Sequence, residues 1–229
     1  MILDVIDDYL DAEECRSLLA EIDAYSAAHE LPFVVREGGE RALRYRVIDG
    51  DRIHDALPRL EDLYAKVQEL VRARSGIADL VPLGNRAAGV NINLTPPGGE
   101  YRWHYDRNAV TAILFLNDVD GGETEAYANF RLYLGRWKHT ALQRALDRLL
   151  LPLRRFVRKQ VIPPRAGRII VMCGDRCLHS VSPVLGGRVR VNAIMTFDRP
   201  QARFRVEENL DPYLYSTDRT PSFDPNYRP

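Results

Sequence analysis

Two histidines and one aspartate in the second half of the chain have the residue types and the order of a metal site. His104 and Asp106 stand one residue apart in the stretch YRWHYDRNAVTAILFLND, and His179 follows in the stretch LHSVSP. Alternate residues at a strand end point the same way, so His104 and Asp106 can both reach one ion. Two imidazoles and one carboxylate leave three metal positions open, as in non-heme iron(II) sites. We therefore predict one iron(II) site, with His179 supplied by a different strand.

Two arginines follow the second histidine closely. Arg188 and Arg190 stand two residues apart, and so on one face of a strand. A guanidinium grips a planar carboxylate with two parallel hydrogen bonds, which lysine cannot do. We expect one of them to bind an acidic ligand beside the metal.

Cysteines offer a competing interpretation of the same region, because Cys173 and Cys177 lie close to His179. Structural zinc usually requires paired Cys-x-x-Cys units and four closed ligands. The joint placement of the two histidines, the aspartate and Arg188 favours iron, although either histidine alone would pass for an ordinary surface or structural residue.

Short strands must position these residues. From residue 88 the chain alternates apolar and polar residues, as in AGVNINLT, and further apolar runs follow in AVTAILFLND, RIIVMCG and RVRVNAIMTF. Turn sequences such as PPGG, DGG, PPRAG and LGG separate them, a pattern typical of a barrel or jelly roll. The predicted fold class is mainly β with flanking α.

Helices are expected around this β core. Asp11 can cap a first helix that carries Glu14 at its third position, and a second helix is predicted over about 53–74. A hairpin with a Gly-Gly turn lies between them. A basic amphipathic insertion over about 136–160 is expected to act as a lid or wall, with its apolar side packed inward, namely Leu142, Leu146 and Leu149.

Length and charge favour one domain and a small-molecule partner. The 229 residues carry 32 basic and 32 acidic side chains, so no global field attracts nucleic acid or a membrane. The predicted organisation is a scaffold over 1–87, a β core over 88–200 and a polar tail over 201–229. Without an apolar window long enough to span a bilayer, we expect a cytoplasmic protein, monomeric or homodimeric.

The motifs HYD at 104–106, GGET at 121–124, PRAGRIIVM from Pro164 and LHSVSPVLGGR at 178–188 occur in a definite order. With them the sequence resembles the iron(II)- and 2-oxoglutarate-dependent oxygenases, in particular their prolyl-4-hydroxylase-like branch, over about 88–198. The resemblance implies a double-stranded β-helix and iron(II) held by His104, Asp106 and His179. It also implies that 2-oxoglutarate chelates the metal and pairs its far carboxylate with Arg188.

One position departs from the family pattern. Phe115 occupies a place where a tyrosine hydroxyl often binds the far carboxylate of 2-oxoglutarate, so another donor is needed. The candidates are Thr111, Asn192 and Tyr101, then Asn91 and Asn93. Arg190 could hold substrate while Arg188 holds 2-oxoglutarate, or the two could exchange roles; the Gly-x-Arg pattern favours Arg188.

The resemblance implies a dioxygenase that uses iron(II), 2-oxoglutarate and O2, with ascorbate as an optional addition, and that releases succinate and CO2. The expected reaction is hydroxylation of an unactivated C–H bond in an amino acid or a secondary metabolite. Desaturation, cyclisation and epimerisation remain open. A peptidyl hydroxylase and a non-catalytic cupin-like binding module are the alternatives.

Overall fold

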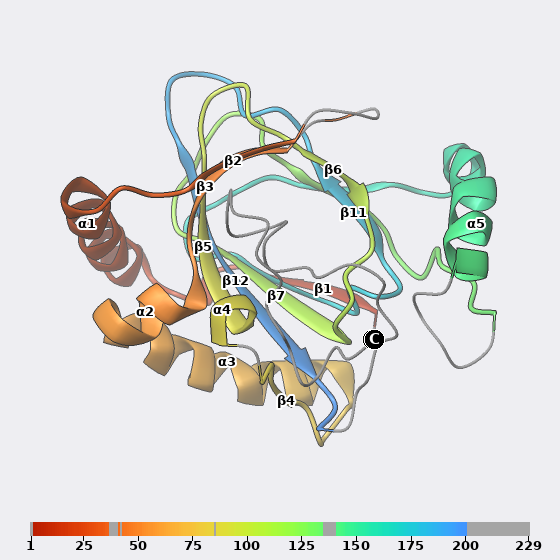
Figure 1. Ribbon diagram of the computed structural model, residues 1–229, viewed down its shortest axis with the longest axis horizontal. Coiled ribbons are helices and arrows are strands. Elements are labelled where there is room, and N and C mark those ends of the chain that lie inside the picture. The colour runs from red at the N-terminus through yellow and green to blue at the C-terminus, as the bar shows by residue number, and fades with distance from the viewer. Residues whose placement is uncertain (1, 37–40, 42, 85, 135–140, 201–229) are drawn as a thin grey trace.

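Two antiparallel β-sheets dominate the protein (Figure 1). The computed structural model describes residues 2–36, 41, 43–84, 86–134 and 141–200. In this part of the chain the larger sheet has the order β1-β10-β7-β12-β5-β3-β2, with β4 paired to β12, and the smaller has the order β6-β11-β8-β9. This architecture confirms the predicted mainly β class with flanking helices.

The larger sheet contains β1 (Leu3–Ile6), β2 (Phe33–Arg36), β3 (Leu43–Ile48), β4 (Val81–Pro82), β5 (Val90–Thr95), β7 (Val110–Phe115), β10 (Ile169–Met172) and β12 (Arg190–Asp198). The smaller sheet contains β6 (Tyr101–His104), β8 (Thr124–Tyr127), β9 (Gln160–Ile162) and β11 (Leu178–Val181). The helices are α1 (Ala12–Ala28), α2 (Gly50–Ala56), α3 (Pro58–Ser75), α4 (Arg86–Gly89), α5 (Ala141–Leu150) and the 3-10 helix η1 (Leu151–Phe156).

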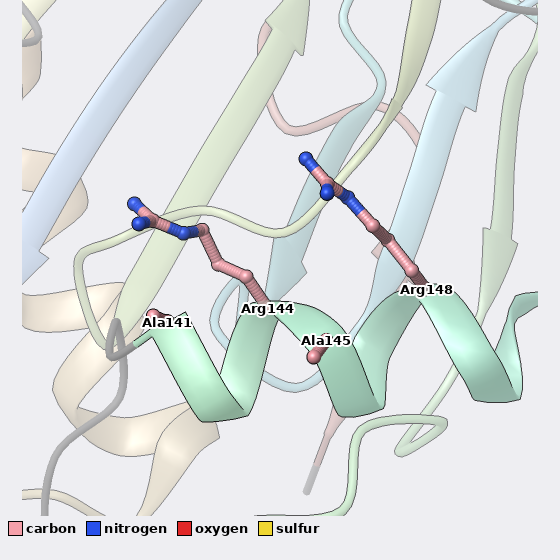
Figure 2. A pocket seen from close by; sticks show the side chains of 4 residues that line it. All are labelled: Ala141, Arg144, Ala145 and Arg148. Atoms are coloured by element: carbon pink, nitrogen blue, oxygen red, sulfur yellow. The ribbon is translucent and has the colours of Figure 1, made fainter.

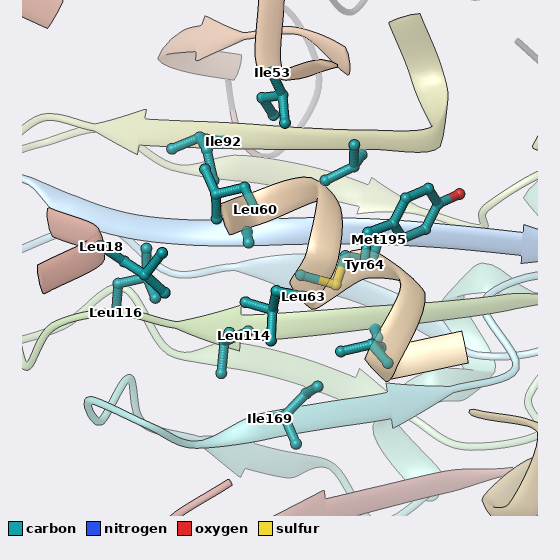
Figure 3. Close-up of a cluster of buried hydrophobic side chains, with 14 of the residues drawn as sticks. Leu18, Ile53, Leu60, Leu63, Tyr64, Ile92, Leu114, Leu116, Ile169 and Met195 are labelled. Carbon is teal, nitrogen blue, oxygen red and sulfur yellow. The ribbon is translucent and has the colours of Figure 1, made fainter. Parts of the chain in front are cut away.

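The strands of the larger sheet alternate between two faces. Val191, Ala193, Met195 and Phe197 of β12 belong to the main core, which lies under α1 and α3. Figure 3 shows Leu60, Leu63 and Tyr64 of α3 in this core with strand residues that include Ile92 and Leu114. Because side chains alternate along a strand, the intervening residues face the space between the sheets, where the polar positions of β5 and β12 gather.

The N-terminal helices follow their predicted signals with one correction. Asp11 caps α1 and forms a capping box with Glu14, as predicted. The single helix expected over about 53–74 is instead two helices, α2 and α3. Pro58 disfavours a helical conformation at Leu57, whose φ and ψ are −128° and 65°, so the chain turns there. The predicted hairpin is present as β2 and β3, whereas its Gly-Gly turn lies outside the described residues.

The insertion between β8 and β9 forms α5 and η1. The expected packing of α5 was wrong for Leu142 and Leu149, whereas Leu146 is half-buried. Leu142 is 67% exposed and Leu149 is 74% exposed, whereas Gln143 is fully buried. The helix therefore turns a polar side inward. Pro152 lies in the first turn of η1, where the α-helix has ended. The expected segment 136–160 begins in residues that the structure does not describe, as does the predicted tail over 201–229.

None of the helices in the described ranges has the length and apolar character needed to span a bilayer. A shallow hollow on α5 is lined by Ala141, Arg144, Ala145 and Arg148, and Figure 2 shows the two arginines projecting to the same side.

Candidate metal centre

His104, Asp106 and His179 lie together at one end of the smaller sheet. His104 ends β6 and pairs in register with His179 of the neighbouring strand β11. Oδ1 of Asp106 lies 3.4 Å from Nε2 of His104 and 3.5 Å from Nε2 of His179. One potential ligand atom from each residue falls within 4.8 Å of the others. The structure thus brings together the three residues that the sequence proposed, from two strands and the loop after β6.

Backbone contacts orient both imidazole rings for metal binding. Nδ1 of His104 is 2.8 Å from the carbonyl oxygen of Arg102, and Nδ1 of His179 is 3.0 Å from that of Cys177. A carbonyl can only accept, so each Nδ1 carries the hydrogen and each Nε2 presents a lone pair. In both rings the lone pair is on Nε2, the nitrogen that faces Asp106. A histidine in this tautomer can bind a metal through Nε2.

A shell of neighbours holds the Asp106 carboxylate. The Thr111 hydroxyl on β7 donates a hydrogen bond of 2.5 Å to Oδ2, and the Asn108 amide donates to Thr111 Oγ1 at 3.0 Å. Asp106 also donates its backbone N–H to the carbonyl of Gly174 at 3.0 Å. Gly174 must be glycine here, since a Cβ would lie 2.1 Å from Asp106 Oδ2. Oδ1 is left to face the histidines.

The charge states of the site suit a cation. Burial raises the pKa of Asp106, but the adjoining His179 and His104 and the Thr111 hydroxyl together hold that pKa below its ordinary value. Burial, and then the neighbouring His104, lower the pKa of His179 to about 4. At neutral pH the carboxylate is therefore ionised and His179 is neutral, so both can donate electron pairs to a metal.

Cysteine does not compete for this position. Among the described residues, the group able to hold a metal consists of His104, Asp106 and His179. The Cys177 thiol is buried and lies 3.5 Å from the carbonyl of Ile2, and burial raises its pKa to about 12. A thiol that resists ionisation is a poor zinc ligand.

The two candidate arginines occupy different environments. Arg188 is exposed in the connection that precedes β12. Arg190 begins β12 and is 3% exposed, with its guanidinium 5.0 Å from the centroid of the Phe115 ring. Its Nη1 donates to Asn192 Oδ1 at 2.5 Å, and its Nη2 lies 3.5 Å from Thr124 Oγ1. Thr124 was not among the residues that the sequence suggested.

The other polar candidates also lie between the sheets. Asn93 of β5 pairs in register with Asn192 of β12, and both are buried on the face opposite the main core. Asn91 is the next inward residue of β5, while Tyr101 stacks on Tyr45, with ring centroids 5.7 Å apart. Thr111 is also inward, but its hydroxyl serves the Asp106 carboxylate.

Comparison with known proteins identifies the family of the segment that contains this site. Residues 90–197 match the model of the 2OG-Fe(II) oxygenase superfamily, a span that includes all three metal-ligand candidates and both arginines. The matched segment, which contains the whole candidate metal site, belongs to the 2OG-Fe(II) oxygenase superfamily. Its members are 2-oxoglutarate-dependent non-heme iron oxygenases, so the chain is an enzyme of this class and its fold is the double-stranded β-helix. No curated protein gives a significant match to the sequence.

Solved 2OG-Fe(II) oxygenases share the fold at low sequence identity. A prolyl-4-hydroxylase from Pseudomonas putida is 22% identical, with a TM-score of 0.56, and the match covers 86% of this chain and 92% of that one. The epimerase SnoN, solved with Fe3+, alpha ketoglutarate and nogalamycin RO, is 19% identical, with a TM-score of 0.70 and coverage of 97% and 89%. The carbocyclase SnoK is 14% identical, with a TM-score of 0.69 and coverage of 96% and 89%.

Proposed function

We propose that this oxygenase holds iron(II) with His104, Asp106 and His179 and oxidises, by hydroxylation in the simplest case, an unactivated C–H bond of a small molecule. The observation that carries the proposal is the convergence of two Nε2 lone pairs and one ionised carboxylate oxygen on one point. This is the donor set of the facial iron site, and it leaves room for other ligands.

Arg190, rather than the expected Arg188, is proposed to bind the far carboxylate of 2-oxoglutarate. A buried cation without a counter-ion is costly. Among the described residues no carboxylate pairs with Arg190, and its Nε has no hydrogen-bond partner. Burial lowers the pKa of Arg190 to about 10, so the side chain stays cationic at neutral pH. A dicarboxylate would supply the missing anion.

Thr124 and Asn192 complete this proposed subsite. The Thr124 hydroxyl and the Asn192 amide already contact the guanidinium. Phe115 lies against the same guanidinium and contributes a flat apolar wall in place of a hydroxyl. Asn93, whose Oδ1 has no hydrogen-bond partner, faces the same space from β5. We assign it, with Asn91 and Tyr101, to contacts with substrate or 2-oxoglutarate.

Iron(II), 2-oxoglutarate and O2, when bound, supply the oxidation of a C–H bond with release of succinate and CO2. The residues of the chain have the remaining tasks. Thr111 and Gly174 fix the Asp106 carboxylate, the backbone carbonyls fix the two imidazoles, and the inward residues of β5 and β12 orient the substrate. Positioning of this kind accounts for a large share of enzymatic rate enhancement.

A small-molecule substrate is supported by the fold comparison. SnoN, whose solved complex contains nogalamycin RO, aligns over 97% of this chain with a TM-score of 0.70, against 0.56 for the bacterial prolyl-4-hydroxylase. An amino acid or a secondary metabolite therefore leads the list of substrate classes. A peptidyl substrate of the prolyl-hydroxylase kind is the other outcome of the test.

The test is turnover of 2-oxoglutarate to succinate by the iron(II)-loaded enzyme, screened against amino acids, metabolites and proline-containing peptides. Mass spectrometry should detect a product that has gained one oxygen atom or lost two hydrogen atoms. The His179→Ala variant should form neither succinate nor product at matched protein concentration. A wild-type protein that binds 2-oxoglutarate but never forms succinate would instead be a binding module.

A further inference from the structure

Arg131 is a buried arginine in the segment that leads from β8 into the insertion. Its side chain is 2% exposed, and it forms a bidentate ion pair with Asp147 of α5. Nε lies 3.2 Å from Asp147 Oδ1, and Nη2 lies 2.7 Å from Asp147 Oδ2. Gln143, one turn earlier on the same side of α5, donates to Asp147 Oδ1 at 2.9 Å. The inward side of α5 is therefore a polar contact built around one guanidinium.

The other side of the same guanidinium contacts the loop between β10 and β11. Nη1 of Arg131 donates to the carbonyl of Asp175 at 3.3 Å, and the Tyr133 hydroxyl donates to that carbonyl at 2.8 Å. The Arg131 backbone N–H donates to the carbonyl of Arg176 at 3.3 Å. The guanidinium also lies 4.7 Å from the centroid of the Tyr105 ring.

These contacts reach both segments that confine the Asp106 carboxylate. Tyr105 directly precedes Asp106, and Asp175 directly follows Gly174, which accepts the Asp106 N–H and lies against its carboxylate. A shift of the Asp175 carbonyl would move Gly174. Because Gly174 is already in close contact with Asp106 Oδ2, the carboxylate would have to move as well.

A buried ion pair is by itself weak evidence for a role in stability. Apolar residues of similar volume often stabilise a protein as well as a buried pair does, since burial of two charges is costly. What the bidentate pair provides is a fixed direction for the remaining N–H groups, which are aimed at the Asp175 carbonyl. The geometry is that of an outer-shell group that orients a metal ligand through its neighbours.

We propose that Arg131 is a positioning residue: anchored by Asp147 of α5, it holds the Gly174 loop and Tyr105 in place and so fixes Asp106 for metal binding. The proposal rests on the assignment of Asp106 as a metal ligand in the proposed function. It gives the insertion a role at the metal that is independent of any contact between the insertion and substrate.

The test uses Co(II), an oxygen-stable substitute for iron(II). Titration of Co(II) into the metal-free protein gives the affinity, and the absorption spectrum of the bound ion reports the geometry of its ligands. Arg131→Met should bind Co(II) about 10- to 100-fold more weakly and with an altered spectrum, as other outer-shell losses do. Arg155→Met is the matched control, because Arg155 is an exposed arginine of the same insertion. It should bind Co(II) like the wild type.

Tyr133→Phe keeps the proposal testable if Arg131→Met does not fold, because it removes only the hydroxyl that bonds the Asp175 carbonyl. This variant should bind Co(II) more weakly than the wild type, while its midpoint of thermal unfolding stays close to the wild-type value. Folded variants that melt at lower temperature, yet bind Co(II) with wild-type affinity and spectrum, would reduce Arg131 to a structural residue and overturn the proposal. A wild-type protein that binds no Co(II) would overturn the metal assignment itself.

Discussion

Thr111 donates a hydrogen bond of 2.5 Å to one oxygen of Asp106, while the other oxygen of the same carboxylate faces His104 and His179. The two oxygens therefore have separate roles. A hydroxyl on β7 fixes the plane of the carboxylate, and the other oxygen is oriented to act as a monodentate ligand in the proposed iron site.

Loss of the Thr111 hydroxyl should weaken metal binding. Thr111→Val retains the shape of the side chain but leaves Asp106 Oδ2 without its donor, so Co(II) affinity should fall about 10- to 100-fold. Thr111→Ser retains the donor and should bind close to wild type. Equal affinities for the valine variant and the wild type, measured by titration, would show that Thr111 does not orient the ligand.

A methyl group at position 174 should displace Asp106. The Cβ of Gly174→Ala would lie 2.1 Å from Asp106 Oδ2, which is closer than atoms can approach, so metal affinity should fall at least about tenfold. Gly187→Ala is the control, because a Cβ there meets no atom within 4 Å. Its free energy of unfolding should change by less than about 0.5 kcal/mol. Wild-type Co(II) affinity in the position 174 variant would contradict the close contact.

Substitution of the two arginines should separate their roles. Arg190→Met should raise the 2-oxoglutarate concentration needed for half-maximal succinate formation by about two to four orders of magnitude, since breaking a buried charge pair costs about 3 to 5 kcal/mol. Arg188→Met removes an exposed charge and should change it by at most about fivefold. A large increase for Arg188→Met with a small one for Arg190→Met would instead assign 2-oxoglutarate binding to Arg188, as the Gly-x-Arg pattern suggested.

Acid should weaken a buried ion cluster on the smaller sheet. Glu125 pairs with Arg41 at 2.6 Å and Lys159 at 2.5 Å. Burial raises the pKa of Glu125, but the bonds from Lys159 and Arg41 outweigh it and hold that pKa below its ordinary 4.5. A lowered pKa in the folded state means that the stabilisation is complete above pH 4.5 and is lost as the pH falls below it.

The matched variant for this cluster is Glu125→Gln. At pH 7 it should lower the free energy of unfolding by about 1 to 3 kcal/mol, because two cations lose their partner. The difference in the free energy of unfolding between the variant and the wild type should shrink as the pH is lowered through 4. Urea denaturation at a series of pH values measures it. A difference that stays constant from pH 7 to pH 3 would show that the charge of Glu125 does not contribute.

The sequence correctly predicted the elements whose signals lie within a few neighbouring residues. Asp11 and Glu14 specify a helix start within four residues, and the alternation in AGVNINLT specifies which side chains of β5 face inward. The sequence could nominate His104 and Asp106 as metal ligands for the same reason, since they lie one residue apart at the end of β6. The resemblance to known oxygenases then supplied the order of the motifs.

The missed features depend on contacts between residues far apart in the chain. Arg131 is 44 residues from Asp175, and Thr124 is 66 residues from Arg190, so no local pattern marks either one. The expected packing of α5 failed because apolar periodicity shows which side of a helix is apolar but not which side faces the protein. Asp147, the single acidic residue in ALQRALDRLLLPLRRFVRK, was the available signal that a basic partner lay underneath.

The most direct test of the metal centre is titration of Co(II) into the metal-free wild-type protein and into His179→Ala, each shown to be folded by circular dichroism. We predict saturable binding of one equivalent to the wild type and no specific binding to the variant. Removal of Cys177 in a Cys177→Ser protein should leave the titration unchanged. Equal Co(II) binding by wild type and His179→Ala, or binding that is lost only in Cys177→Ser, would contradict the assignment.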